Sequence, residues 1–163
     1  MKQRRFSAFW IFTFLLLLQA VDARSQSNTL ALTVISPWNF VINDPTKIET
    51  PQVINNAFIL SVYSTNKDCD VYARISSYTA PTGFIPASSP LSLDFTQTTC
   101  PSSDYYNLYT QPLTLSGTDQ LLFSHGKAHP TYNYSYNINL AALGYDYIPG
   151  TYNWEITFTM TQP

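Results

Sequence analysis

Large apolar residues alternate with polar residues along most of this chain. The strictest case is a run of five, in which every second position is apolar: Tyr152, Trp154, Ile156, Phe158 and Met160. A period of two is that of a β-strand with one buried face, and beyond residue 23 no stretch has the 3.6-residue period of an amphipathic helix. The pattern predicts a terminal strand whose apolar face closes a hydrophobic core while its threonine face meets solvent or a partner.

The same alternation predicts strands at 29–35, 57–65, 70–76, 90–98 and 132–140, with weaker candidates at 107–115 and 119–123. In the strand at 132–140, Tyr132, Tyr134 and Tyr136 fall on the same face as Ile138 and Leu140, so we expect these tyrosines to face the core. Clusters of Pro, Gly, Ser and Asn separate the strands. Eight or nine short strands at this spacing predict an all-β fold, an antiparallel β-sandwich that is immunoglobulin-like in outline.

The N-terminus has the features of a secretory signal peptide. Basic residues at 2, 4 and 5 precede an apolar run at 8–20, and small residues follow it up to Ala23. We expect residues 1–23 to be removed, leaving a single exported domain at 24–163 that is extracellular, periplasmic or on the cell surface. The alternative is a retained anchor helix, which the short run disfavours because a bilayer span needs about 20 apolar residues.

Charge argues against one class of partner. Removing residues 1–23 leaves five Lys and Arg against nine Asp and Glu, a formal charge of −4. Binding to nucleic acid requires clustered basic residues, so we expect no nucleic-acid partner. Aromatic residues make up 15% of the chain and charged residues only 11%. Thr, Ser, Asn and Tyr replace the missing charged residues, a composition that suits exposed strands in an extracellular setting.

Two cysteines, Cys69 and Cys100, lie in the exported part. An even number of cysteines in an oxidising compartment predicts a disulfide, which would stabilise the fold by about 3 to 4 kcal/mol. The alternatives are a catalytic thiol and a metal ligand. Both need further ligands or a base that the sequence does not place nearby.

No set of residues assembles into a catalytic or metal site. His125 and His129 are four apart, but Gly126 and Pro130 make the segment a loop, and we interpret both histidines as exposed. Only two glutamates are present and no serine lies in a G-x-S-x-G elbow. We therefore expect no catalytic residues, no metal, no cofactor and no enzymatic activity.

Three tyrosines, Tyr105, Tyr106 and Tyr109, follow Pro101 in a segment that is interpreted as a loop. Exposed aromatic rings can stack on sugars or anchor a protein interface, so these residues are candidate ligand-binding residues. The alternative is ordinary loop packing. Asn133 begins an N-x-S glycosylation motif and should face outward, opposite the neighbouring tyrosines.

The stretch at 147–163, YIPGTYNWEITFTMTQP, resembles the closing strand of bacterial surface β-sandwiches. It is similar to the WxL surface-domain group and, more loosely, to spore-coat-U and fimbrial pilin-like domains. Phe158-Thr159-Met160 stands where the second W-x-L of that group would be. The resemblance implies a β-sandwich at the cell surface.

The leading functional hypothesis is a non-enzymatic structural or adhesion protein that contacts other surface proteins or the cell envelope. Exposed strand edges are templates for strand addition, so residues 29–35 and the last strand are the expected contact elements, and self-assembly by strand addition is one form of it. The alternative is a carbohydrate-binding module that uses the three tyrosines as a platform.

Overall fold

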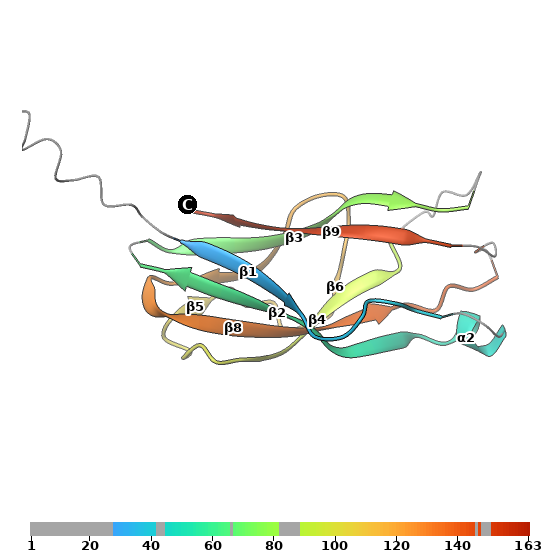
Figure 1. Cartoon of the computed structure of the whole chain (residues 1–163), viewed down its shortest axis with the longest axis horizontal. Helices are drawn as coiled ribbons and strands as arrows, with labels where there is room; N and C mark the ends of the chain where they lie inside the picture. The colour runs from blue at the N-terminus through green and yellow to red at the C-terminus, as the bar shows by residue number, and fades with distance from the viewer. Residues whose placement is uncertain (1–27, 42–44, 66, 82–88, 146, 148–150) are drawn as a thin grey trace, which may run out of the picture.

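The computed structural model describes residues 28–41, 45–65, 67–81, 89–145, 147 and 151–163. Two antiparallel sheets stack face to face, which confirms the all-β sandwich (Figure 1). The predicted signal peptide at 1–23 lies outside the described residues. Within the described ranges, no helix has the length and apolar character needed to span a bilayer.

The first sheet has five strands in the order β1-β2-β8-β4-β6. Their bounds are β1 (Thr29–Val34), β2 (Gln52–Ser64), β8 (Ala128–Leu140), β4 (Leu91–Thr98) and β6 (Leu113–Thr114). The second sheet has four strands in the order β5-β7-β3-β9. These are β5 (Tyr105–Tyr106), β7 (Gln120–His125), β3 (Cys69–Thr79) and β9 (Asn153–Thr161). One short helix, α2 (Pro45–Glu49), precedes β2.

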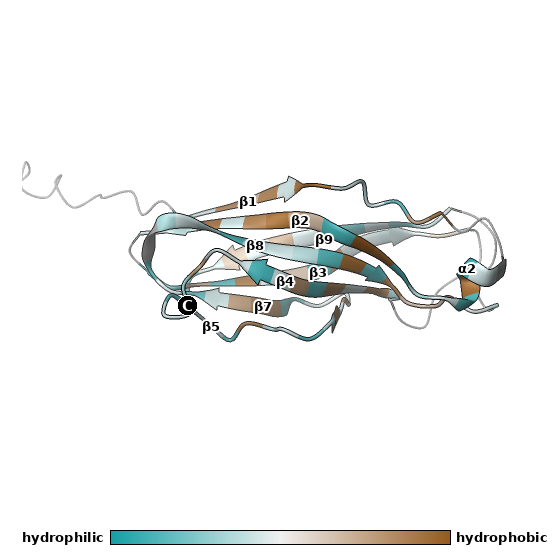
Figure 2. Ribbon diagram, turned by 90° about the horizontal axis from the view of Figure 1, so that it is seen from below, coloured by the Kyte–Doolittle hydropathy of each residue, from teal (hydrophilic) through white to brown (hydrophobic). Residues whose placement is uncertain are grey.

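The core lies between the sheets and is built by the alternation seen in the sequence (Figure 2). On β2, Phe58, Leu60 and Val62 are all fully buried. Tyr134 and Tyr136 of β8 are buried on the same side, as predicted. Ring contacts join the layers: Phe58 packs on Phe158 of β9 at 5.1 Å between centroids, and Tyr134 stacks on Phe123 of β7 at 3.8 Å. Thus β2 lies opposite β9, and β8 lies opposite β7.

The weaker strand predictions fail in part, for local reasons. Of residues 107–115 only Leu113–Thr114 form a strand, because Pro112 has no amide hydrogen to donate to a ladder. The strand predicted at 119–123 continues to His125. Helix α2 has no counterpart in the sequence prediction, because five residues are too few to show a helical period.

The ends of the described chain lie at the same end of the sandwich. Thr29 pairs with Tyr63, and Thr161 pairs with Asp70, on either side of the turn that joins β2 to β3. Helix α2 and the start of β9 lie at the opposite end (Figure 1).

Candidate functional site at the β1 and β9 edge

The inward face of β1 is uncovered at Leu32 and Val34, whereas Leu30 on the same face is partly buried against the core. Leu32 pairs with Leu60 and Val34 pairs with Phe58 across the β1–β2 ladder, so each pair points to the same side of the sheet. Leu60 and Phe58 are 0% exposed, yet Leu32 is 44% and Val34 is 53% exposed. Among the described strands, β9 is the edge strand of the second sheet, and it lies opposite β2. No described strand therefore lies opposite β1.

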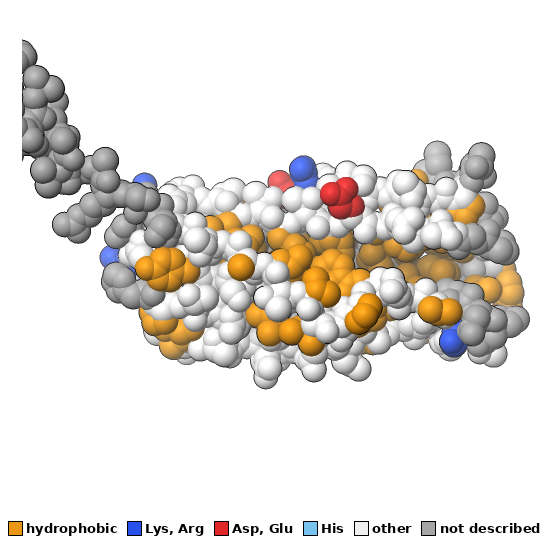
Figure 3. Space-filling view, viewed as in Figure 1, with side chains coloured by type: hydrophobic (Ala, Val, Ile, Leu, Met, Phe, Trp, Pro, Cys, Tyr) orange, Lys and Arg blue, Asp and Glu red, His pale blue; other side chains and the backbone are white. Residues whose placement is uncertain are grey.

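Strand β9 borders the same opening. Among the described residues it pairs only with β3, so its other edge is free. Its inward residues Trp154, Ile156, Phe158 and Met160 are only partly buried, although they pack against the core. A band of apolar side chains accordingly runs along the middle of the face shown in Figure 3. We call this surface, formed by the inward residues of β1 and the free edge of β9, the β1/β9 edge.

One part of the opening is covered by the segment that follows β1. The Trp38 ring packs on Phe58 at 5.3 Å between centroids, and its Nε1 donates a hydrogen bond to the Ala57 carbonyl at 3.2 Å. The amides of Ile35 and Ser36 donate to that same carbonyl. These contacts turn the chain away from the β2 ladder after Val34 and leave the inward face of β1 itself open.

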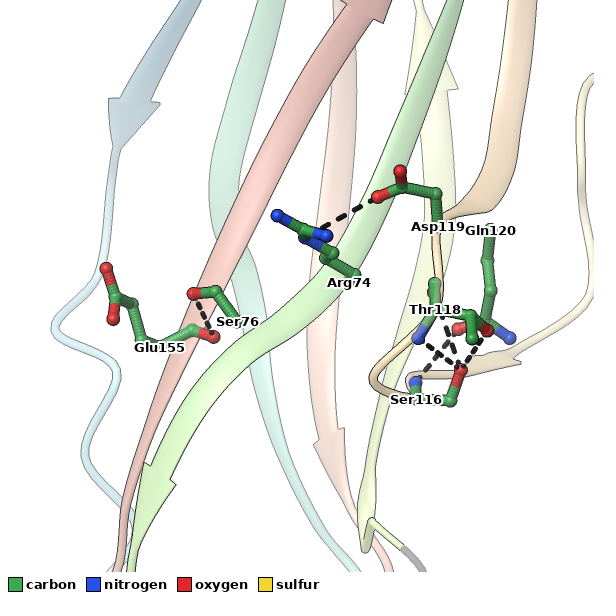
Figure 4. Close-up of polar contacts among 7 residues, drawn as sticks. All are labelled: Arg74, Ser76, Ser116, Thr118, Asp119, Gln120 and Glu155. Carbon is green, nitrogen blue, oxygen red and sulfur yellow. Dashed lines mark hydrogen bonds and ion pairs between the residues drawn. The ribbon is translucent and has the colours of Figure 1, made fainter.

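The outer face of β9 differs from its inner face in being polar and bonded to β3 (Figure 4). At a register shift in β3, Ser76 Oγ donates to the Glu155 carbonyl at 3.2 Å, and Ser77 Oγ donates to Glu155 Oε2 at 2.8 Å. Arg74 of β3 forms an ion pair with Asp119 at 3.6 Å, between two exposed side chains. The apolar surface therefore belongs to the edge and interior of the sandwich and not to its outer face.

The predicted disulfide is not formed, because Cys69 and Cys100 are both free, buried thiols. They lie at the start of β3 and just after β4, as the strand predictions placed them. One histidine, His125, lies beside both cysteines. It pairs with Cys69 across the β3–β7 ladder, and its Nδ1 lies 3.8 Å from Cys100 Sγ. The disulfide was predicted from the number of cysteines and the expected compartment. Neither of these shows where the two cysteine side chains lie between the sheets.

His125 is fully buried, so the interpretation of it as an exposed loop residue is wrong. It is the last residue of β7, where it shares the inward face with Phe123, and its Nδ1 is hydrogen-bonded to the Tyr134 hydroxyl at 2.8 Å. The side chain of His129 lies outside the described residues.

Burial keeps this cluster neutral. It raises the pKa of the Cys69 thiol to about 11, with Asp70 and Asp68 adding to the effect, and it also raises the pKa of Cys100. The pKa of His125 is lowered by the same burial. A thiolate beside an imidazolium, the reactive form of a cysteine–histidine pair, is therefore disfavoured here.

The three candidate tyrosines are not brought together as one platform. Tyr105 and Tyr106 are adjacent residues of the short strand β5, where a loop was expected, so their rings point to opposite faces. Tyr105 packs edge-on against Tyr134 of the core at 6.4 Å. Tyr106 and Tyr109 are exposed, and the Tyr106 hydroxyl donates to Asp68 Oδ2 at 2.9 Å.

The structure also describes the predicted glycosylation position, Asn133. Asn133 lies on the outer side of β8, opposite the tyrosines, where its Oδ1 accepts a hydrogen bond from Ser61 Oγ at 2.7 Å. In the part of the chain that is described, no group of three or more His, Cys, Asp or Glu side chains is placed to hold a metal ion.

Comparison with known proteins adds no family. No protein-family model matches this sequence, and no curated protein matches it either.

Proposed function

We propose that this protein is a non-enzymatic, exported structural or adhesion β-sandwich that binds other proteins through the β1/β9 edge. The observation that supports it is the exposure of Leu32 and Val34, which point inward like their buried neighbours but are left about half exposed. Contiguous apolar surface beside an unpaired strand edge is the usual form of a strand-addition site. The leader-like N-terminus and the resemblance to bacterial surface domains agree with this role and remain predictions.

The partner element that fits is a single extended segment. Paired with the free edge of β9, such a segment would make the second sheet five strands wide and would lie over the inward face of β1. A second folded copy cannot supply its own β9 in a continuous antiparallel sheet. Antiparallel pairing of two β9 strands requires a two-fold axis perpendicular to the second sheet. This axis would place the five-stranded sheets of both copies on the same face of the joined sheet, where their β1 strands would overlap.

The energy of this contact can be placed on a scale. Full burial of a Leu or Val side chain is worth about 1.5 to 3 kcal/mol. Because Leu32 and Val34 are each about half exposed, covering both would contribute roughly 2 kcal/mol, in addition to the backbone hydrogen bonds of β9. Replacing one of them by threonine should then weaken association about five- to tenfold.

The test compares Val34→Thr with Val53→Thr. Val53 is 51% exposed, close to the 53% of Val34, but lies on the outer side of β2, next to inward-facing Ile54. A second copy can still donate its residues 29–35 as the extended segment. We therefore expect concentration-dependent association in size-exclusion chromatography, and binding of a synthetic peptide of residues 29–35, to weaken in Val34→Thr and to persist in Val53→Thr.

Two results would contradict the proposal. One is a protein that stays monomeric at all concentrations and does not bind the peptide. The other is an equal effect of the two substitutions, which would mean that the edge has no special role.

The carbohydrate-binding alternative has less support. A platform needs aromatic faces exposed side by side, and Tyr105 and Tyr106 face opposite ways. If it holds nonetheless, binding to a glycan array should disappear in Tyr106→Ala and Tyr109→Ala, while Val34→Thr leaves it intact.

A further inference from the structure

A cavity of about 360 Å³ opens between the two sheets at the end of the sandwich near α2. Its inner wall is formed by Leu91 of β4 with Ile138 and Leu140 of β8, all nearly fully buried. Trp154 and Ile156 of β9 close it from the other sheet. The cavity is therefore a part of the interior that the side chains do not fill, and it lies apart from Leu32 and Val34.

The mouth of the cavity has a different character from its inner wall. Asn39, Thr151 and Asn153 line it and are exposed, while the rings of Trp38 and Tyr152 flank them. The Tyr152 ring stacks on Trp154 at 5.7 Å with an interplanar angle of 12°, which makes a flat aromatic wall. Polarity thus rises from an apolar interior to an uncharged polar rim.

This gradient defines the ligand. None of the described lining residues has a carboxylate, ammonium, guanidinium or imidazole group, so a charged ligand would find no counter-charge. A sugar inserted against Leu91 and Ile138 would leave buried hydroxyls unpaired, which costs about 1 to 3 kcal/mol for each. An apolar chain has no such cost and gains from burial.

From these contacts we infer that the cavity binds the alkyl chain of a neutral amphiphile, with the chain against the β4 and β8 wall and the uncharged head group at the Asn39 and Thr151 rim. A dry cavity of about 150 Å³ accommodates the six carbons of benzene. In proportion, 360 Å³ takes a chain of roughly a dozen carbons. Such a chain can come from a free monoacyl compound or from a lipid in a membrane.

The protein contains its own reporter for this site. Trp38 and Trp154 both line the cavity, and the remaining tryptophan is Trp10 in the predicted leader. Titration with 1-monoacylglycerols of 8 to 14 carbons, below their micelle concentrations, should give a saturable change in tryptophan fluorescence with one ligand per protein. Each added methylene should tighten Kd by up to about fourfold until the cavity is full.

A blocking variant tests the location. Leu143 is a partly buried residue at the cavity, and Leu143→Trp should weaken binding at least tenfold when it is measured by calorimetry. Val53→Trp places the same side chain on a partly exposed position away from the cavity and should leave binding unchanged. Circular dichroism of both variants shows whether either has lost its sheets. If Leu143→Trp does not fold, Thr151→Phe at the exposed rim takes its place.

A second arm separates the two sources of the chain. Neutral phosphatidylcholine vesicles should bind the protein only if a membrane lipid can deliver its chain to the cavity. Saturable binding of monoacylglycerol without vesicle binding indicates a free amphiphile. The inference is overturned by three results: no saturable binding of any chain length, binding that does not depend on chain length, and binding that survives the block. Val34→Thr should not affect any of these measurements, which keeps this test separate from that of the β1/β9 edge.

Discussion

The same substitution at two tyrosines of one strand should change the free energy of unfolding in opposite directions. Tyr134 and Tyr136 are two residues apart on the inward face of β8, and both are buried. The Tyr134 hydroxyl is hydrogen-bonded to His125, whereas the Tyr136 hydroxyl has no partner among the described residues. Burial raises the pKa of both phenols, so both are neutral at ordinary pH. The substitution Tyr→Phe removes the same atom from two very different environments.

The magnitudes follow from these contacts. A buried polar group without a partner costs about 1 to 3 kcal/mol, so Tyr136→Phe should regain part of this and raise the free energy of unfolding by about 1 kcal/mol. Its ring should stay in place, because it stacks on Phe58 at 5.3 Å and meets Phe95 edge-on at 5.7 Å. Tyr134→Phe breaks the bond to His125 and leaves the buried Nδ1 with only the weak contact to Cys100 Sγ at 3.8 Å, so it should lower the free energy of unfolding by about 1 to 3 kcal/mol.

Urea denaturation followed by tryptophan fluorescence measures both changes. The midpoint should move to higher urea for Tyr136→Phe and to lower urea for Tyr134→Phe, with the same slope m in each case. In thermal unfolding the expected separation of the two variants is about 6 to 12 °C. Destabilisation of similar size in both variants would refute the reasoning. It would mean that the Tyr136 hydroxyl makes a hydrogen bond that stabilises the fold as much as that of Tyr134.

Two further predictions concern the cluster of Cys69, Cys100 and His125. Both thiols should be unreactive towards Ellman's reagent in the native protein, because they are buried and their pKa values are raised. After denaturation two thiols per chain should react. A count below two would contradict the free-thiol arrangement. The folded protein holds His125 neutral with a lowered pKa, whereas the unfolded chain binds a proton near pH 6.5, so acid favours unfolding. The free energy of unfolding should therefore fall as the pH drops below about 6.5, and His125→Asn should remove much of this slope. The titratable groups near this imidazole include Tyr132, Tyr134, the two thiols, Asp104 and Asp68.

The strong strand predictions succeed where a long apolar alternation meets a two-sided core. In β8 the inward tyrosines and the outward Asn133 follow directly from their spacing, because successive residues of a strand point to opposite faces. The same rule places Leu32 and Val34 on the inward face of β1. It cannot say that this face is uncovered, because coverage depends on how many strands the opposite sheet contains.

The interior chemistry was predictable only in part. Phe123 and His125 are two apart, so strand spacing could have placed the imidazole inside, but Gly126 and Pro130 favoured a loop. The disulfide prediction relied on the number of cysteines, and burial beside His125 was not visible in it. The cavity near α2 is lined by residues from segments that are separate in the sequence. A local sequence pattern cannot predict that these segments leave a space between them.

The positions of the two chain ends bear on how the molecule can be held. Because β1 begins and β9 stops at one end, an affinity tag or a covalent tether attached directly before β1 or directly after β9 would orient the protein in the same way. The opening between the sheets near α2 would then project from the support into solution. Immobilised on a sensor chip or displayed on a bead, the protein should keep that mouth accessible, whether it is attached next to β1 or next to β9.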